Sequence, residues 1–148
     1  MLSPSEQRLW QFFTEIGILD QLGRTVAESA LVSGLSLAQF ALLNHLVRLG
    51  GDWSPVRLAR AFQVTKQTMT STLARLERQG YVAIRPDPAD GRAKLVSITP
   101  EGTAVHSVCL ARVGPAMAVA VDAVPEGLVE MLLPKLVTLR EALDKARG

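Results

Sequence analysis

The sequence holds only one cysteine, Cys109, and only 5% of its 148 residues are aromatic. A single cysteine excludes an intramolecular disulfide framework and a multi-cysteine metal cage, which favours a reduced setting. A membrane span needs about 18 consecutive apolar residues, and no run in the sequence approaches that length. The stretch from Met1 to Trp10 has neither the basic start nor the apolar run of a signal peptide. We therefore expect a cytoplasmic protein without a membrane partner.

Groups of residues that catalysis requires are also missing. We find no nucleophile beside a base, no carboxylate pair and no phosphate-binding glycine loop placed together. His45 and His106, with the lone cysteine, do not show the spacing of metal ligands. The sequence predicts that the protein is not an enzyme, holds no metal and needs no cofactor.

Positive charge is concentrated in the middle of the chain. The segment from Ser54 to Lys94 has eight basic and three acidic residues, whereas the rest has eight basic and eleven acidic residues. A concentrated positive segment suits a polyanion, because neutralising phosphates releases their counterions. An ordinary solvated basic face would account for the same excess, so charge alone does not decide between the two.

Two helices are predicted ahead of this basic segment. Apolar residues recur every three or four positions from about Pro4 to Ala30, which predicts one amphipathic helix about 40 Å long. After a break, Ser36 and Gln39 have the spacing of a capping box, and Gly50 ends the second helix. The stripe of the first helix consists of Leu9, Phe13, Ile16, Leu19, Leu22 and Val26.

The basic segment itself has the order helix, turn, helix, hairpin. Ser54 before Pro55 predicts the start of a short helix that reaches Phe62, and Thr65 predicts the cap of a second helix that ends near Gln79. Alternating residues from Val82 and from Lys94 predict two strands joined by a Pro/Asp/Gly-rich turn. This order is typical of a winged helix-turn-helix, with the hairpin as the wing.

Helices are predicted again beyond the hairpin. Thr99 and Pro100 start a helix that continues to about Ala123, with a kink expected at Gly114-Pro115. A last helix begins near Pro125, with a second kink expected at Pro134. We predict a mainly α fold (α+β by its small hairpin) in a single domain of residues 1–148. Its winged helix-turn-helix lobe spans about 36–99, and helical arms span about 1–32 and 100–148.

The exposed face of the second helix in the pair is suited to reading DNA. With Met69 placed at the buried centre, Gln67, Ser71 and Arg78 point away from the core. Small and amide-bearing residues permit close approach to base edges in the major groove. Any solvent-facing helix carries the same residue types, so this face alone is not decisive.

The chain resembles the MarR family in several stretches between about residues 35 and 102. These are Ser54 to Ala59, Val64 to Thr70, Leu76 to Val82, Arg85 to Arg92 and Leu95 to Gly102. The resemblance implies a transcriptional regulator whose second helix lies in the major groove and whose Arg92 enters the minor groove. The narrow minor groove attracts a guanidinium because its negative potential is concentrated. The expected DNA contacts are Ser54, Arg57, Thr65, Lys66, Gln67, Thr68, Thr70, Ser71, Arg75, Arg78, Arg92 and Lys94.

Two further wing residues carry expectations from this resemblance. Asp90 is expected to orient Arg92 or Arg75 rather than to act as a catalytic acid. Gly91 stands where many members carry a second basic residue, which implies weaker wing contacts.

The arms resemble the family's dimerisation arms, so we predict a homodimer that binds a near-palindromic operator in double-stranded DNA, as a repressor. Apolar surface on long arms needs a partner, although two helices folded back on their own subunit would also cover it. A ligand- or protein-binding module with a degenerate winged helix and no specific DNA target is the alternative function.

A small aromatic or phenolic effector is a further expected partner, because family members often respond to such ligands. The residues that line its expected pocket are Trp10, Phe13, Leu43, His45 and Arg48, although apolar residues at helical spacing are more often plain core. Cys109 lies among apolar residues, and we predict a buried, inert thiol there rather than a redox sensor.

Overall fold

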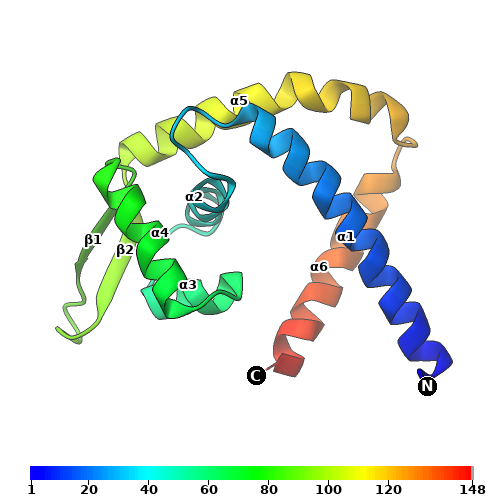
Figure 1. Cartoon of the computed structure of the whole chain (residues 1–148), viewed down its shortest axis with the longest axis horizontal. Helices are drawn as coiled ribbons and strands as arrows, with labels where there is room; N and C mark the ends of the chain where they lie inside the picture. Colours follow the sequence, from blue (N-terminus) through cyan, green and yellow to red (C-terminus); the bar gives the residue numbers. More distant parts are fainter. Residues whose placement is uncertain (148) are drawn as a thin grey trace. The chain divides into compact units, whose positions relative to one another are not determined.

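The computed structural model describes residues 1–147 and is mainly α-helical with one small β-hairpin (Figure 1). This architecture confirms the predicted fold class. Packing divides the chain into two compact units, residues 1–113 and the residues from 114 onward, and each is described by itself. The single domain predicted over the whole chain stays a prediction. The elements are α1 (Pro4–Ala30), α2 (Leu37–Leu49), α3 (Pro55–Phe62), α4 (Lys66–Arg78), β1 (Val82–Pro86), β2 (Lys94–Ile98), α5 (Pro100–Ala123) and α6 (Leu128–Arg147).

Helices α2, α3 and α4 begin at capping residues that the sequence indicated. The Ser36 hydroxyl accepts from the Gln39 N–H, and the Gln39 side chain accepts from the Ser36 N–H, which completes the predicted capping box. Ser54 caps α3, and Thr65 caps α4. Each cap satisfies a backbone donor that the helix cannot satisfy itself, typically worth about 1 kcal/mol. The caps therefore fix where the two helices of the pair begin.

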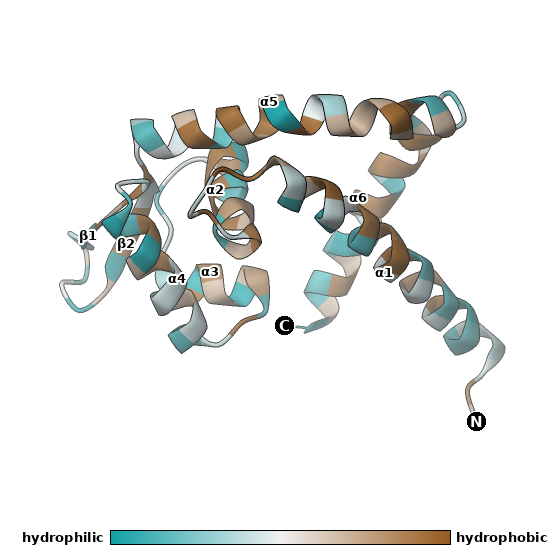
Figure 2. Ribbon diagram, turned by 45° about the horizontal axis from the view of Figure 1, so that its top comes forward, coloured by the Kyte–Doolittle hydropathy of each residue, from teal (hydrophilic) through white to brown (hydrophobic). Residues whose placement is uncertain are grey.

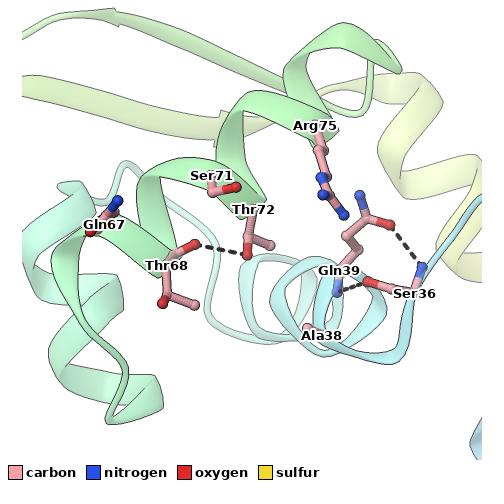
Figure 3. Close-up of a pocket in the computed structure, with 8 residues that line it drawn as sticks. All are labelled: Ser36, Ala38, Gln39, Gln67, Thr68, Ser71, Thr72 and Arg75. Carbon is pink, nitrogen blue, oxygen red and sulfur yellow. Dashed lines mark hydrogen bonds between the residues drawn. The ribbon is translucent and has the colours of Figure 1, made fainter.

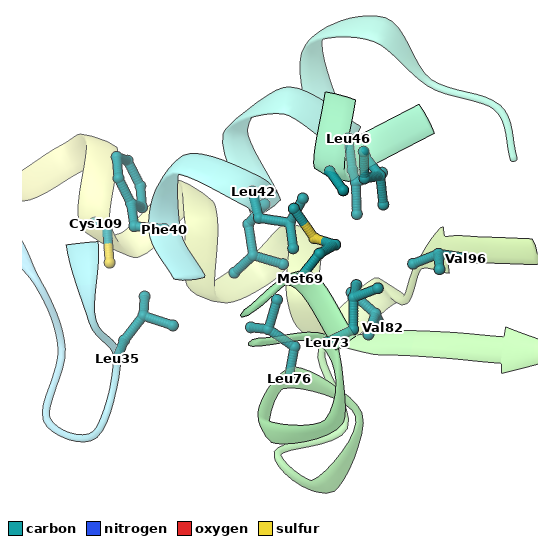
Figure 4. Packing of buried hydrophobic residues seen from close by; sticks show 13 residues of the cluster. Leu35, Phe40, Leu42, Leu46, Met69, Leu73, Leu76, Val82, Val96 and Cys109 are labelled. Carbon is teal, nitrogen blue, oxygen red and sulfur yellow. The ribbon is translucent and has the colours of Figure 1, made fainter. Parts of the chain in front are cut away.

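The hydrophobic core lies between α2, α3, α4 and the hairpin, with a contribution from α5 (Figure 4). Leu58 and Leu76 have no exposed surface, and Val82 and Val96 close the core from the strands. Cys109 of α5 is also fully buried, as predicted. The side chains that fill this core are Leu35, Phe40, Leu42, Leu43, Leu46, Leu58, Ala59, Met69, Leu73, Leu76, Val82, Val96 and Cys109.

The wing is broader than the sequence indicated. β1 and β2 pair in antiparallel register from Val82 opposite Ile98 to Pro86 opposite Lys94. Trp53 adds a third segment, because its N–H donates to the Val96 carbonyl at 3.0 Å and the Val96 N–H donates to its carbonyl at 2.8 Å. The connection before α3 is therefore an edge of the wing sheet.

The start of α5 is pressed against the residues that precede β1. The Thr99 hydroxyl accepts from the Gly102 N–H at 3.0 Å and donates to the Gly80 carbonyl at 2.6 Å. A Cβ atom at Gly102 would lie 2.1 Å from the Tyr81 carbonyl oxygen. Only glycine fits at this position without a backbone shift.

Two prolines lie inside the last two helices. α5 continues through Pro115, and α6 continues through Pro134, so neither residue ends its helix. α6 begins at Leu128, slightly later than predicted.

Helix α5 is the most apolar long helix among the described residues. By length and composition it is apolar enough to cross a membrane, with a mean hydropathy of 1.5 over 18 residues. Arg112 lies within that stretch, so the expectation that no run approaches 18 consecutive apolar residues holds. Within the first unit, however, α5 contributes to the protein core: Cys109 is buried, and His106 bonds to Asn44 across 2.9 Å.

The apolar stripe of α1 is largely uncovered within its unit. Hydrophobic positions follow the helix in Figure 2, yet Ala30 is its only buried residue. Leu9 is 42% exposed and Leu22 is 62% exposed. The stripe has the periodicity of a buried face without a covering surface in the same unit.

Candidate nucleic-acid interface

Helix α4 presents a free ridge between two clefts. Met69, Leu73 and Leu76 turn into the core, which leaves the opposite side of the helix exposed. The predicted contact residues at Gln67, Thr70 and the positions around them are among the exposed ones. An α-helix must project in this way to enter the major groove, which is about 12 Å wide. α4 therefore has the geometry of a recognition helix, the helix that contacts base edges in the major groove.

The first cleft lies between α4 and the first turn of α2 and has a volume of about 360 Å³ (Figure 3). One row of α4, formed by Gln67, Ser71 and Arg75, lines it. The other lining residues are Thr68 and Thr72 of α4, Ala38 and Gln39 of α2, and Ser36, the cap of α2. Gln67, Ser71 and Arg75 combine an amide, a small hydroxyl and a guanidinium, which are groups that contact base edges and phosphates. The sequence had assigned Ser36 and Gln39 to helix capping only.

The second cleft, of about 610 Å³, lies between α4, the start of α3 and the wing. It brings together six residues named from the sequence that come from three separate stretches of the chain. Its basic groups carry charge suited to phosphates, while Glu77 and Ile84 are lining residues that the sequence did not indicate. The six are Ser54, Lys66, Thr70, Asp90, Arg92 and Lys94.

The tip of the wing is a tight turn held by backbone contacts. Asp90 Oδ1 accepts from the Arg92 backbone N–H at 3.1 Å, and the Ala93 N–H donates to the Asp90 carbonyl at 2.9 Å. Asp90 forms no salt bridge with Arg92 or Arg75 among the residues that the structure describes. Its side chain therefore acts on the backbone of Arg92 and leaves the exposed Arg92 side chain available, and its orienting role stays a prediction.

Three of the predicted hydroxyl contacts are engaged inside the helix pair, those of Ser54 and Thr65 as helix caps and that of Thr68 as the partner of Thr65. The Thr65 hydroxyl accepts from the Thr68 N–H at 3.1 Å and donates to the Thr68 hydroxyl at 2.9 Å. The Ser54 hydroxyl accepts from the Arg57 N–H at 3.2 Å. Ser54 and Thr65 serve first to cap their helices, and any contact with DNA is additional.

The remaining predicted arginines lie apart from the wing cleft. Arg78 shares a third cleft with Arg75 and with Gly34 at the end of the α1–α2 connection. Arg57 lies over the indole of Trp53, with its guanidinium carbon 4.3 Å from the ring centroid. The predicted contact set therefore occupies more than one surface of the lobe.

The five residues of the expected ligand pocket lie in different surroundings, and the pocket itself stays a prediction. Leu43 is fully buried in the core, whereas Trp10 is 68% exposed on α1 and Phe13 is also exposed. His45 packs edge-on against Trp53 and Phe62. None of the five, Arg48 included, lines the three clefts described above.

Both histidines are held in surroundings that disfavour their charged form. Burial, followed by the nearby charges of Arg48 and Arg57, lowers the pKa of His45 below its ordinary value. Burial also lowers the pKa of His106, which stacks on Phe40 with ring centroids 5.5 Å apart. Neutral imidazoles are therefore favoured at both positions.

The lobe is thus a winged helix-turn-helix, and comparisons with known proteins agree. The model of the MarR family matches residues 33–93. The transcriptional activatory protein BadR of Rhodopseudomonas palustris is 34% identical over 99 residues, which are 66% of this chain and 57% of BadR. The chain spans just over half the length of the curated relatives it matches. Over its winged-helix lobe this chain is therefore similar to regulators of the MarR family.

Solved structures extend the likeness in fold to most of the chain. A mutant MarR from Escherichia coli complexed with operator DNA is 24% identical, with a TM-score of 0.72 over 93% of this chain and 99% of that one. BpsR of Bordetella bronchiseptica, whose DNA binding is regulated by 6-hydroxynicotinic acid, is 21% identical with a TM-score of 0.71 over 88% of this chain and 98% of that one. At these identities the likeness is one of fold.

Proposed function

We propose that this protein is a transcriptional regulator that binds double-stranded DNA, with α4 in the major groove and Arg92 of the wing in the minor groove. The wing cleft supports this proposal most directly. It brings Lys66 of α4 together with Arg92 and Lys94 of the wing, beside the exposed side of α4. A degenerate module without a DNA target would not need these cations together.

We also propose that the protein acts as a homodimer on a near-palindromic operator in the cytoplasm. The exposed apolar stripe of α1 supports this, because monomeric soluble proteins rarely leave large contiguous apolar surfaces in water. A two-fold dimer places its recognition helices about 34 Å apart, one turn of DNA. The solved structure of a MarR mutant is an example of this fold in complex with operator DNA.

Selection of bound sequences from random duplex DNA, followed by a salt titration, tests the proposal. We expect a sequence with two related half-sites about one helical turn apart. The logarithm of affinity should fall with the logarithm of salt concentration by about 0.9 per phosphate contacted. Arg140→Ala is the control for loss of one positive charge, because Arg140 pairs with Asp144 on α6, outside the lobe. This variant should show the same salt dependence as the native chain. Absent binding, or binding without salt dependence, would favour the interaction module.

We also propose that the protein represses transcription and that a small aromatic ligand releases it from DNA. Among structures of this fold, BpsR is regulated by such a compound, which supports a ligand without indicating its site in this chain. A reporter gene placed downstream of the selected sequence tests whether the protein represses or activates transcription. Lower expression in the presence of the protein is expected, and higher expression, the behaviour suggested by the name of BadR, would overturn repression.

A further inference from the structure

We propose that Trp53 is a positioning residue that holds the Arg57 guanidinium ready to contact a DNA phosphate beside the wing. This inference rests on the proposed DNA-binding function. It assigns a role to Trp53, whose place in the sequence marks only a short connection before α3.

The contact between the two side chains provides the first evidence. The Arg57 guanidinium carbon lies 4.3 Å from the centroid of the Trp53 ring, within the range of a cation–π interaction. No carboxylate forms a salt bridge with Arg57 among the described residues. A guanidinium stacked on a ring keeps its edge N–H groups free, and those groups match the geometry of a phosphate. Trp53 therefore restricts the arginine without using its hydrogen-bond donors.

The ring itself is fixed from several directions. Its indole N–H donates to the Gly50 carbonyl at 2.9 Å, and its backbone pairs with Val96 on the wing. His45 packs edge-on against the ring, with centroids 4.6 Å apart, and is in turn packed against Phe62. A ring fixed in this way gives Arg57 a defined position at a smaller loss of side-chain entropy when DNA binds.

The location of this pair matches the edge of the proposed interface. Trp53 immediately precedes Ser54, and Ser54, Pro55 and Val56 line the wing cleft. Arg57 belongs to the same first turn of α3 and is exposed. Asp52 on the other side of Trp53 pairs with Arg85 of β1 at 2.6 Å, which ties the same segment to the wing. The arginine thus follows directly after residues that line the wing cleft, on a segment that is tied to the wing.

A double-mutant cycle tests this role, with affinity measured for one fixed duplex of about 30 base pairs of mixed sequence. We expect Trp53→Leu to weaken binding about threefold in the otherwise native chain, the size of an exposed cation–π contact. Arg57→Ala should lower the salt slope by about 0.9, as one phosphate contact would. In the Arg57→Ala background, Trp53→Leu should change affinity by less than about 1.5-fold.

Arg60→Ala provides the matched control background. Arg60 is also on α3 but stacks on no ring among the described residues. A merely structural role for Trp53 would weaken binding equally in the Arg57→Ala and Arg60→Ala backgrounds, and that result would overturn the proposal. Trp53→Phe, which keeps a ring, should restore most of the affinity that Trp53→Leu loses.

A fluorescence measurement avoids substituting Trp53 at all. In a Trp10→Phe chain Trp53 is the only tryptophan. Adding the duplex should change its emission when Arg57 is present and should leave it unchanged in the Arg57→Ala chain. The same change in both chains would contradict the proposal. If the native chain binds the duplex at no salt concentration, the DNA-binding function itself fails, which is a different outcome from binding without coupling.

Discussion

The lobe and the first arm use the same apolar periodicity with opposite results. Leu73 and Leu76 of α4 recur at helical spacing and are at most 1% exposed. Leu19 and Leu22 of α1 recur at the same spacing and are 61% and 62% exposed. The lobe packs short elements against one another, whereas α1 extends over 27 residues with little to cover it.

This difference shows that apolar periodicity determines which face of a helix is apolar. It does not determine which other surface covers that face. A lobe that covers its own apolar face gains stability within one chain. An arm that leaves its face open gains stability only when another surface covers it. Stability of the fold and assembly of the protein should therefore depend on separate sets of residues, which substitutions can distinguish.

The largest expected effect is on the core of the lobe. Leu73→Ala should lower the free energy of unfolding by about 2 to 5 kcal/mol, because it leaves a cavity in a packed interior. Leu49→Ala is the control, since Leu49 is a leucine of the same lobe that is 50% exposed, and it should cost about 0.5 kcal/mol or less. Denaturant unfolding of both variants gives the comparison. Similar losses would show that the lobe core is not the main source of stability.

The next effect is on assembly. The double change Leu19→Asp and Leu22→Asp should raise the dissociation constant of the dimer at least about 100-fold, or about 2.7 kcal/mol, because it places charges on the apolar stripe. Light scattering should give twice 16.0 kDa for the native chain and 16.0 kDa for the variant. Gln21→Asp adds a charge on the same exposed helix outside the stripe and should stay dimeric. A native mass of 16.0 kDa would instead mean that the arms are covered within their own subunit.

A smaller effect is expected at the wing. Arg92→Ala should lower DNA affinity at least about tenfold, or about 1.4 kcal/mol, because it removes the cation proposed for the minor groove. The fold and the oligomeric state should not change, since the Arg92 side chain is exposed. Affinity is compared with the native chain at one salt concentration. Unchanged binding would remove Arg92 from the interface.

The smallest effect concerns pH and is expected at the lobe core, where His106 stacks on Phe40 and bonds to Asn44 of α2. Burial lowers the pKa of His106, so the unfolded chain binds a proton more readily than the folded chain. Stability is therefore complete above the ordinary value of 6.5 and falls as pH drops through the lower folded pKa. His106→Gln should reduce this loss in denaturant unfolding from about pH 8 to about pH 5, and an equal loss in both chains would exclude His106 as its source.

Local chemistry made much of this structure predictable. Ser54, Thr65 and the capping box at Ser36 act through neighbours three residues away, so the sequence alone fixes them. The wing was predictable for the same reason, because its turn and its alternation are short-range signals. Contacts between distant segments were not: the pairing of Trp53 with Val96 depends on how the chain returns.

The candidate site divides in the same way. The reading face of α4 follows from helical spacing, and Gln67, Ser71 and Arg75 do line one cleft. The bond from the Arg92 backbone to Asp90 and the stacking of Arg57 on Trp53 depend on rotamers and turn geometry that residue types do not specify. The residues of the expected ligand pocket were grouped only by the helices that carry them. Of these residues, Leu43 belongs to the core.

The close approach of Gly102 to the Tyr81 carbonyl has a consequence for protein engineering. Because Thr99 bonds to Gly80 and Gly102 packs on Tyr81, the first turn of α5 belongs structurally to the lobe. A chimera that joins foreign arms at Thr99 would replace this turn and shift the wing. A junction after Val113, where the compact unit ends, would transfer the arm and leave the lobe intact.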